Sequence, residues 1–474
     1  METKTDPSGG AAARPGAWRA LLASIRGVEA DYTSIDLKRA IFLLAVPMVL
    51  ELVMESTFAV ADIFFVGKIG PSAIATVGLT ETYLFLLYSV AMGLSTAVTA
   101  ITARRIGEKD PAAAANVAVQ SIILALLVSI PFSIAGLFFA KDLLALMGAD
   151  AWAVEHGYKY TRIMLGGNAV IVLLFVINAV FRGAGDPAVA MRILWLANGI
   201  NMILDPILIF GWGPIPAFGI EGAAAATTLG RGIAVLAQLW YLFKGNRQIA
   251  LSRASLRWDG AVALQVFRTS LGGVGQMIVG MTSWIFLMRI LAGVGSTAVA
   301  GATIALRVMM FTLMPAWGLS NAAATLVGQN LGAGRPDRAE SSVWRIGFYN
   351  TWFLAAVALA YFFGNVWLMR LFTEDGKVIA VGSSWLRILS YSFIVYGWWM
   401  VATQAFNGSG DTRTPTLINI VFFWMIQIPL SWFLAVRLDW EHMGVFWGVF
   451  LSETSVGLFT LWLFSRGKWK TMKV

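Results

Sequence analysis

Apolar stretches of about 20 residues recur along nearly the whole chain, separated by short polar segments. A helix of that length crosses the hydrocarbon core of a lipid bilayer. The pattern therefore predicts an all-α polytopic membrane protein with twelve transmembrane helices. Their predicted limits are residues 38–66, 72–103, 114–140, 160–181, 188–210, 220–243, 263–291, 298–328, 345–369, 384–406, 415–436 and 442–464.

A repeat links the two halves of this pattern. When the second half is laid on the first so that Gly295 meets Gly70, the two match without a gap over residues 70–186. Each copy holds six predicted helices, so both copies enter the membrane from the same side. We therefore expect two six-helix bundles related by a pseudo-twofold axis, with a central cavity between them. Other matched pairs are Gly107 with Gly332, Pro111 with Pro336, and Asp186 with Asp411.

The loops predict the orientation. Basic residues gather between spans 2 and 3, 6 and 7, and 8 and 9, and in the C-terminal tail, so the positive-inside rule places both termini in the cytoplasm, under the inner (plasma) membrane. Residues 16–28 have the pattern of an amphipathic surface helix. The predicted domains are a cytoplasmic tail (1–37), an N-terminal lobe (38–245), a cytoplasmic linker (246–262), a C-terminal lobe (263–465) and a basic cytoplasmic tail (466–474).

Composition agrees with a membrane protein. The 474 residues are 58% hydrophobic and 13% charged, which leaves no room for a sizeable soluble domain. The net charge of +9 is explained by the cytoplasmic loops, so we expect no nucleic-acid partner. The chain has no cysteine, which excludes disulfides and thiolate chemistry. Since it also lacks a Walker A motif and any other enzyme motif, we expect neither enzymatic activity nor a cofactor.

Three carboxylates lie within the first predicted span. On a helix, Glu55 is rotated by about 40° from Glu51 and Asp62 by about 20°, so all three share one face. Ionisable groups at membrane depth are costly and normally face a protein interior or a water-filled cavity. Such a stripe can hold a proton or be neutralised by a cation. The alternative is a hydrogen-bonded stripe that only fixes packing.

The fifth span carries a second polar face. Asn198, Asn201 and Asp205 follow one another at helical spacing, and Pro206 frees a backbone carbonyl by kinking the helix. Carboxylate, amide and carbonyl oxygens are suitable ligands for a hard cation such as Na⁺. The alternative is a kink that polar groups merely cap.

The repeat separates these two explanations. If the acids only built the scaffold, the second copy would be expected to keep them, but it does not. We therefore expect the cation site to be confined to the N-terminal lobe. Asp62 corresponds to Leu287, Asp205 to Leu430, Asn201 to Ile426, Glu55 to Gly280 and Glu51 to Gln276.

Further polar positions are candidates for the same site or for the cavity. Tyr160 and Asn178 are separated by about five whole helical turns, so they are expected to share a face. Thr227 follows a run of small residues that permits close helix approach. Candidates for the substrate cavity are Glu51, Asn198, Glu81, Arg307 and Glu453.

Taken together, these features resemble the multidrug and toxic compound extrusion (MATE) transporters. The resemblance covers residues 38–465 and rests on the twelve-span repeat, on Asp62 in the first span, on Asn201 with Asp205 in the fifth, and on the strings at 327–334 and 406–412. Within the family it points to the DinF-like branch, because the position of the NorM-like seventh-span glutamate is Gly280 here. Glu55 departs from the family, which often has an uncharged polar residue there.

The resemblance implies export of organic, often cationic and lipophilic compounds, coupled to inward H⁺ or Na⁺ through rocker-type alternating access. It also implies a cation site formed by Asp62, Asn201 and Asp205, which would be the ligands if the ion is Na⁺. Tyr160, Asn178 and Thr227 would support them. We count Glu55 with this site. Two alternatives stay open: a flippase for a lipid-linked or amphipathic substrate, which usually has fourteen spans, and a passive channel. The internal duplication makes a monomer sufficient.

Overall fold

The computed structural model describes residues 17–28, 30–245, 248–251 and 256–472. The predicted tail before residue 17, parts of the predicted linker and the last two residues lie outside these ranges. Within them the protein is all-helical and forms no β-strand, which confirms the predicted fold class. A short helix, α1 (Ala17–Arg26), precedes the first span and a single turn, η5 (Lys468–Thr471), follows the last.

Twelve helical segments of membrane length follow one another in the described part of the chain. Eleven are long and apolar enough to span a bilayer; α8, which contains Arg231 and Gln238, is the other. The segments are α2 (Leu37–Gly67), α3 (Pro71–Gly107), α4 (Pro111–Leu146), η1 (Ala153–Gly157) with α5 (Tyr158–Gly166) and α6 (Ala169–Ala184), α7 (Pro187–Phe210), α8 (Ile220–Lys244), α9 (Gly260–Val294), α10 (Ser296–Gly332), α11 (Pro336–Arg370), α12 (Gly376–Ser409), α13 (Arg413–Asn419) with η3 (Ile420–Gln427), α14 (Ile428–Trp432) and η4 (Phe433–Arg437), and α15 (Glu441–Ser465).

The backbone follows the repeat closely. α3 and α10 both have 37 residues, and they begin and end at positions that the repeat pairs. α6 and α12 both end at a left-handed glycine, Gly185 with φ 86° and Gly410 with φ 92°, where a side chain would be strained. Helix starts are also matched, because Pro111 and Pro336 open α4 and α11.

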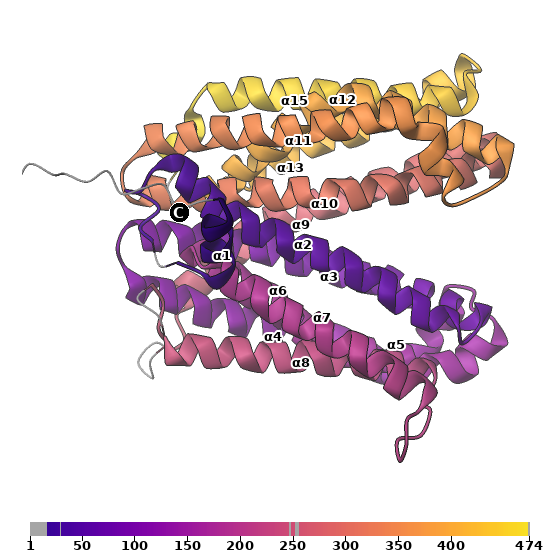
Figure 1. Ribbon diagram of the computed structural model, residues 1–474, viewed down its shortest axis with the longest axis horizontal. Helices are drawn as coiled ribbons and strands as arrows, with labels where there is room; N and C mark the ends of the chain where they lie inside the picture. Colours follow the sequence, from indigo (N-terminus) through magenta and orange to yellow (C-terminus); the bar gives the residue numbers. More distant parts are fainter. Residues whose placement is uncertain (1–16, 29, 246–247, 252–255, 473–474) are drawn as a thin grey trace, which may run out of the picture.

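Each half of the chain builds its own apolar core, one mainly from α3–α8 and one from α9–α15. The first helix of each half packs against the other half as well, α2 on α10 and α9 on α3. Figure 1 shows the two groups of helices meeting at the end that carries α1 and the C-terminus, and diverging toward the opposite end.

Glycines mark the contact between the halves. A Cβ atom on Gly107 of α3 would lie 2.1 Å from the Gln329 carbonyl oxygen of α10, and one on Gly332 would lie 2.2 Å from the Arg104 oxygen of α3. At the opposite end of the same helices, Gly78 and the N-cap Gly295 have open space at this position. A third apolar core, which joins α2 with α10, α11 and α12, lies at the terminal end. The halves are therefore closed at this end.

The diverging end carries polar and apolar side chains between the halves. Glu81 of α3 and Arg307 of α10 are both exposed there and lie within electrostatic range of each other. A groove of about 580 Å³ runs along α2 and is lined by one residue of α10, Phe311. The α2 side of the groove is Val53, Ser56, Thr57, Val60, Ala61, Phe64 and Phe65.

Candidate ion-binding site in the N-terminal half

Six helices of the N-terminal half bring their polar residues together. α2 contributes Glu51, Glu55 and Asp62, and α7 contributes Asn198, Asn201 and Asp205. The remaining groups come from α3, α5, α6 and α8. These residues form three clusters along α2, and each carboxylate of α2 has a different set of partners.

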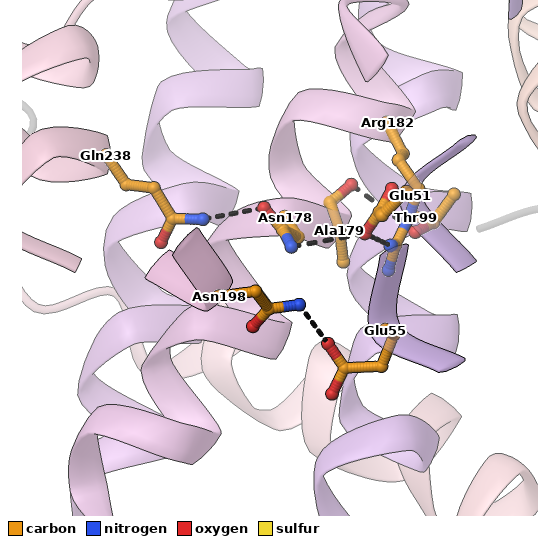
Figure 2. A network of polar contacts seen from close by, with 8 residues as sticks. All are labelled: Glu51, Glu55, Thr99, Asn178, Ala179, Arg182, Asn198 and Gln238. Carbon is orange, nitrogen blue, oxygen red and sulfur yellow. Dashed lines mark hydrogen bonds and ion pairs between the residues drawn. The ribbon is translucent and has the colours of Figure 1, made fainter. Parts of the chain in front are cut away.

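The first cluster surrounds Glu51, which is 5% exposed. Arg182 of α6 donates from Nη1 to Glu51 Oε1 at 2.9 Å, and Asn178 Nδ2 donates to the same oxygen at 3.2 Å. Gln238 of α8 in turn donates to Asn178 Oδ1 at 2.6 Å, which completes a chain across three helices (Figure 2). Glu51 is therefore paired inside the protein. This differs from the expectation that it lines the substrate cavity.

The second cluster surrounds Glu55. Asn198 Nδ2 donates to Glu55 Oε2 at 3.0 Å (Figure 2), and Arg231 Nη2 lies 3.4 Å from Glu55 Oε1. Arg231, whose side chain is 7% exposed, also donates to the Tyr88 hydroxyl at 3.1 Å and lies over the Phe58 ring. Glu55 is thus neutralised by an arginine of the same half.

The third cluster contains Asp205, which is 0% exposed. Among the described residues, neither of its carboxylate oxygens has a hydrogen-bond partner. Asn201, one turn earlier, donates from Nδ2 to Thr227 Oγ1 at 2.9 Å, while its own Oδ1 likewise has no partner in the described part of the chain. Three buried oxygens that could accept a proton or ligate a cation therefore lie on one helix.

Asp62 belongs to this third cluster. It is half-buried on α2 and lies within electrostatic range of Asp205, Glu81 and Arg231. Tyr160 of α5 is 4% exposed and lies within the same range of Asp62. Two aspartates that interact across α2 and α7 form an electrostatically coupled pair.

The fourth span is interrupted between two of its candidate residues. α5 ends at Gly166, and Asn168 donates from its side chain to the Leu165 carbonyl before α6 begins. Tyr160 of α5 lies near Asp62, and Asn178 of α6 donates to Glu51, so both reach α2, at different depths. The shared face that the spacing predicts for Tyr160 and Asn178 stays a prediction.

Three residues that the sequence pattern does not single out are central to these clusters: Arg182, Arg231 and Gln238. Arg182 lies just beyond the predicted span 160–181 and therefore falls in a predicted loop. Arg231 lies in the middle of the predicted span 220–243, where an ionisable residue is itself a signal of a partner or a function.

In the C-terminal half, the cavity candidate Glu453 is only 6% exposed, on α15 against α12. Arg307 and Glu81 remain exposed between the halves. No group of three or more metal-binding acidic or histidine side chains occurs in the described residues. Any Na⁺ at the third cluster would therefore have the carboxylates of Asp62 and Asp205 beside the neutral amide oxygen of Asn201.

The fold and the polar clusters together indicate the class of protein. A duplicated all-helical membrane protein with buried carboxylates between its helices is a secondary transporter rather than an enzyme. The MatE family model matches residues 47–207 and again 272–433, and the chain belongs to this family. The two matches begin at Pro47 and Gly272, which are paired in the register that places Gly70 on Gly295.

The chain is similar to known transport proteins over most of its length. The chain is 25% identical to the probable multidrug resistance protein NorM of Thermotoga maritima over 442 residues, which is 93% of this chain and 94% of that one. It is 27% identical over 407 residues to an FAD transporter of Shewanella oneidensis, covering 84% and 88%. A solved outward-facing conformation of a multidrug resistance MATE family transporter of the MOP superfamily superposes with a TM-score of 0.86 at 26% identity, covering 95% and 99%.

Proposed function

We propose that this transporter exports organic, often cationic and lipophilic compounds in exchange for H⁺ or Na⁺. The cation binds at Asp62, Asn201 and Asp205, with Thr227 and Tyr160 as supporting groups, and the arrangement is of the DinF-like kind. Relatives named as multidrug resistance proteins support the substrate class. The apolar groove along α2 also suits lipophilic compounds.

One observation carries the proposal. Asp205 is fully buried, and neither of its oxygens accepts a hydrogen bond from a described residue. Burying an unpaired carboxylate is costly, so the group gains stability from a proton or a cation. A proton needs only the carboxylate, whereas Na⁺ would be held by oxygens of Asp205, Asn201 and Asp62. The residues fit either ion, because Asn201 Oδ1 is also without a partner in that part of the structure.

The closed end suggests how exchange works. With both termini in the cytoplasm, the glycine contacts between α3 and α10 close the cytoplasmic side, so the cavity is open to the outside. We infer that cation binding at Asp62 and Asp205 bends α2 at Pro47 and weakens substrate binding in this outward-facing state. Antiport requires such negative coupling, which typically amounts to about 1–3 kcal/mol. Rocking of the two bundles would then return the cation to the cytoplasm.

The test is efflux in everted vesicles, with a proton gradient and a Na⁺ gradient imposed separately. Asp62→Asn and Asp205→Asn should each reduce gradient-driven dye efflux by roughly 5–150-fold, the range that a coupling free energy of this size gives. Asp142→Asn is the matched control, because Asp142 is an exposed carboxylate at the end of α4. Full transport by both aspartate variants would exclude the site.

The same vesicles decide between substrate classes and mechanisms. Because one relative is an FAD transporter, FAD is assayed beside organic cations. Uphill accumulation distinguishes an antiporter from a passive channel, which only equilibrates its solute. A flippase usually has fourteen spans, and the twelve helical segments of the described residues favour the antiporter.

A further inference from the structure

The C-terminal half contains a buried carboxylate of its own. Glu453 lies in the middle of α15 and is 6% exposed. Ser392 of α12 is its hydrogen-bond partner, donating from Oγ to Glu453 Oε2 at 3.4 Å. The proposed cation site at Asp62, Asn201 and Asp205 lies in the other half of the chain, so Glu453 is not part of that site.

No positive charge in the described part of the chain compensates Glu453. No basic side chain there forms an ion pair with it, and Tyr396 of α12 is the titratable group in electrostatic range. The basic side chains of the helices packed on α15 are directed elsewhere or exposed, and the titratable groups of α15 itself lie about three turns away. Arg387 lies over the Phe362 ring and Arg437 over the Trp432 ring, while Lys377, Arg268, Arg289 and Arg413 are exposed. On α15 itself, Glu441 lies beside His442.

The repeat shows what stands at this position in the other half. A Cβ atom on Gly230 of α8 would lie 2.8 Å from the Ala197 carbonyl oxygen, and Ser452 of α15 donates to the Phe422 oxygen at 2.8 Å. Ala197 and Phe422 are paired in the repeat register, so Gly230 and Ser452 are equivalent. The next residues along the two helices are Arg231 and Glu453.

Arg231 and Glu453 therefore occupy equivalent places with opposite charge. The loop before α15 is shorter than the loop before α8. If the register that places Gly70 on Gly295 were continued through this loop, Gly230 would meet Ser455 instead of Ser452. The difference in loop length therefore hides the equivalence in the sequence. Gly222 and Gly444 support the corrected pairing, because each packs against the end of the preceding helical segment, at Leu208 and Leu434.

The two equivalent residues differ in their partners. In the N-terminal half the arginine has Glu55 and Tyr88 as polar partners, whereas the polar partners of the glutamate of the C-terminal half, among the described residues, are the hydroxyls of Ser392 and Tyr396. The positive charge of Arg231 is therefore balanced by Glu55, whereas no basic side chain among the described residues balances Glu453.

We propose that Glu453 is a second proton-binding site, in the C-terminal lobe, which adds one proton to those carried in each transport cycle. A buried carboxylate without a cationic partner is stabilised by taking up a proton, and the resulting O–H group can donate to Ser392 Oγ. Na⁺ prefers several oxygen ligands, and the described surroundings offer mainly the hydroxyls of Ser392 and Tyr396. The claim that Glu453 adds a proton to each transport cycle rests on the proposed function. The claim that Glu453 binds a proton does not.

Infrared difference spectroscopy of the purified full-length protein, between alkaline and acidic pH and without substrate, tests proton binding. The carboxylic-acid band of Glu453 should be present in the wild type and in Asp205→Asn, and absent in Glu453→Gln. Glu441→Gln is the matched control, since Glu441 is an exposed carboxylate on the same helix. A Glu453→Gln spectrum identical to that of the wild type overturns the proposal, whatever the protein transports.

Reversal-potential measurements in proteoliposomes test the transport part. The number of protons exchanged per substrate should fall by one in Glu453→Gln and return to the wild-type value in Glu453→Asp. A merely structural glutamate would lower the transport rate or the protein yield without changing this ratio. An unchanged ratio in a folded Glu453→Gln transporter therefore overturns the coupling role. If the wild-type protein transports none of the tested compounds, the result contradicts the proposed function instead.

Discussion

Arg182 and Glu51 are the charged counterpart of a neutral pair in the other half of the chain. Arg182 Nη1 lies 2.9 Å from Glu51 Oε1. Their equivalents in the repeat, Asn407 and Gln276, exchange two hydrogen bonds of 3.0 and 3.3 Å. The same contact between the first and fourth spans of each repeat is therefore built once with charges and once with amides.

This equivalence predicts how the pair responds to substitution. Arg182→Asn alone leaves Glu51 buried without its cation and should destabilise the protein by about 3–5 kcal/mol. Adding Glu51→Gln recreates the amide pair of the other half and should recover most of that loss. The measurement is the melting temperature of the purified variants in detergent. A double variant as unstable as Arg182→Asn would show that the two halves do not use this position in the same way.

Much of this organisation could be predicted from the sequence. The apolar periodicity and the repeat indicate the helical segments, because membrane helices satisfy their backbone hydrogen bonds internally and depend little on distant contacts. The carboxylates of the first and fifth spans stand out because charge at membrane depth is rare. Asp62, Asn201 and Asp205 can be selected in this way before their partners are known.

The partners could not be predicted in the same way. Whether Glu51 faces a cavity or an arginine depends on how α2, α6 and α8 pack, and Arg182 lies just outside its predicted span. Helical spacing also does not show that the fourth span is interrupted after Gly166. The equivalence of Arg231 and Glu453 is hidden because the repeat changes its register in a loop. Local periodicity does not determine such long-range contacts.

Arg231 should set how strongly the proposed site at Asp62, Asn201 and Asp205 holds a cation. Its guanidinium lies 3.4 Å from Glu55 and within electrostatic range of Asp62, so it competes with a bound cation. Arg231→Gln should therefore tighten cation binding by about tenfold or more, since an opposite charge this close strongly favours the ionised carboxylate. Half-maximal efflux would shift to a more alkaline external pH, or to lower external Na⁺. Arg231→Lys keeps the charge and should stay near the wild type; a shift of equal size there, or none in Arg231→Gln, would contradict the argument.

Thr227 should distinguish the two coupling ions. Its hydroxyl accepts a hydrogen bond of 2.9 Å from Asn201 and so orients the amide oxygen that would ligate Na⁺. Groups that orient a ligand typically change metal affinity by about 10–100-fold when removed. Thr227→Val should therefore raise the Na⁺ concentration for half-maximal efflux by that factor, while proton-driven efflux should change little. Thr228→Val is the control, because Thr228 donates only to the Ala224 carbonyl of its own helix. Equal effects of the two valine variants would exclude a role for the Asn201 contact.

Gly107 should determine whether the terminal end of the transporter can close. Its α-carbon faces the Gln329 carbonyl of α10 so closely that a methyl group would lie 2.1 Å from the oxygen, and backbone cannot move away without separating the halves. Gly107→Ala should therefore disfavour the conformation described here and reduce transport. Because the chain has no cysteine, a single Thr325→Cys reports on this contact: Thr325 is buried and donates to the Arg182 carbonyl across the two halves.

Maleimide should label Thr325→Cys slowly in the wild-type background and much faster when Gly107→Ala is added. Gly78→Ala, on the same helix but with open space around its Cβ position, should leave both labelling and efflux unchanged. The pseudo-symmetric Gly332→Ala meets the Arg104 carbonyl at 2.2 Å and should reproduce the effect of Gly107→Ala. Slow labelling in both tight-contact variants would mean that the end stays closed despite the added methyl groups, and that the glycines are not needed for closure.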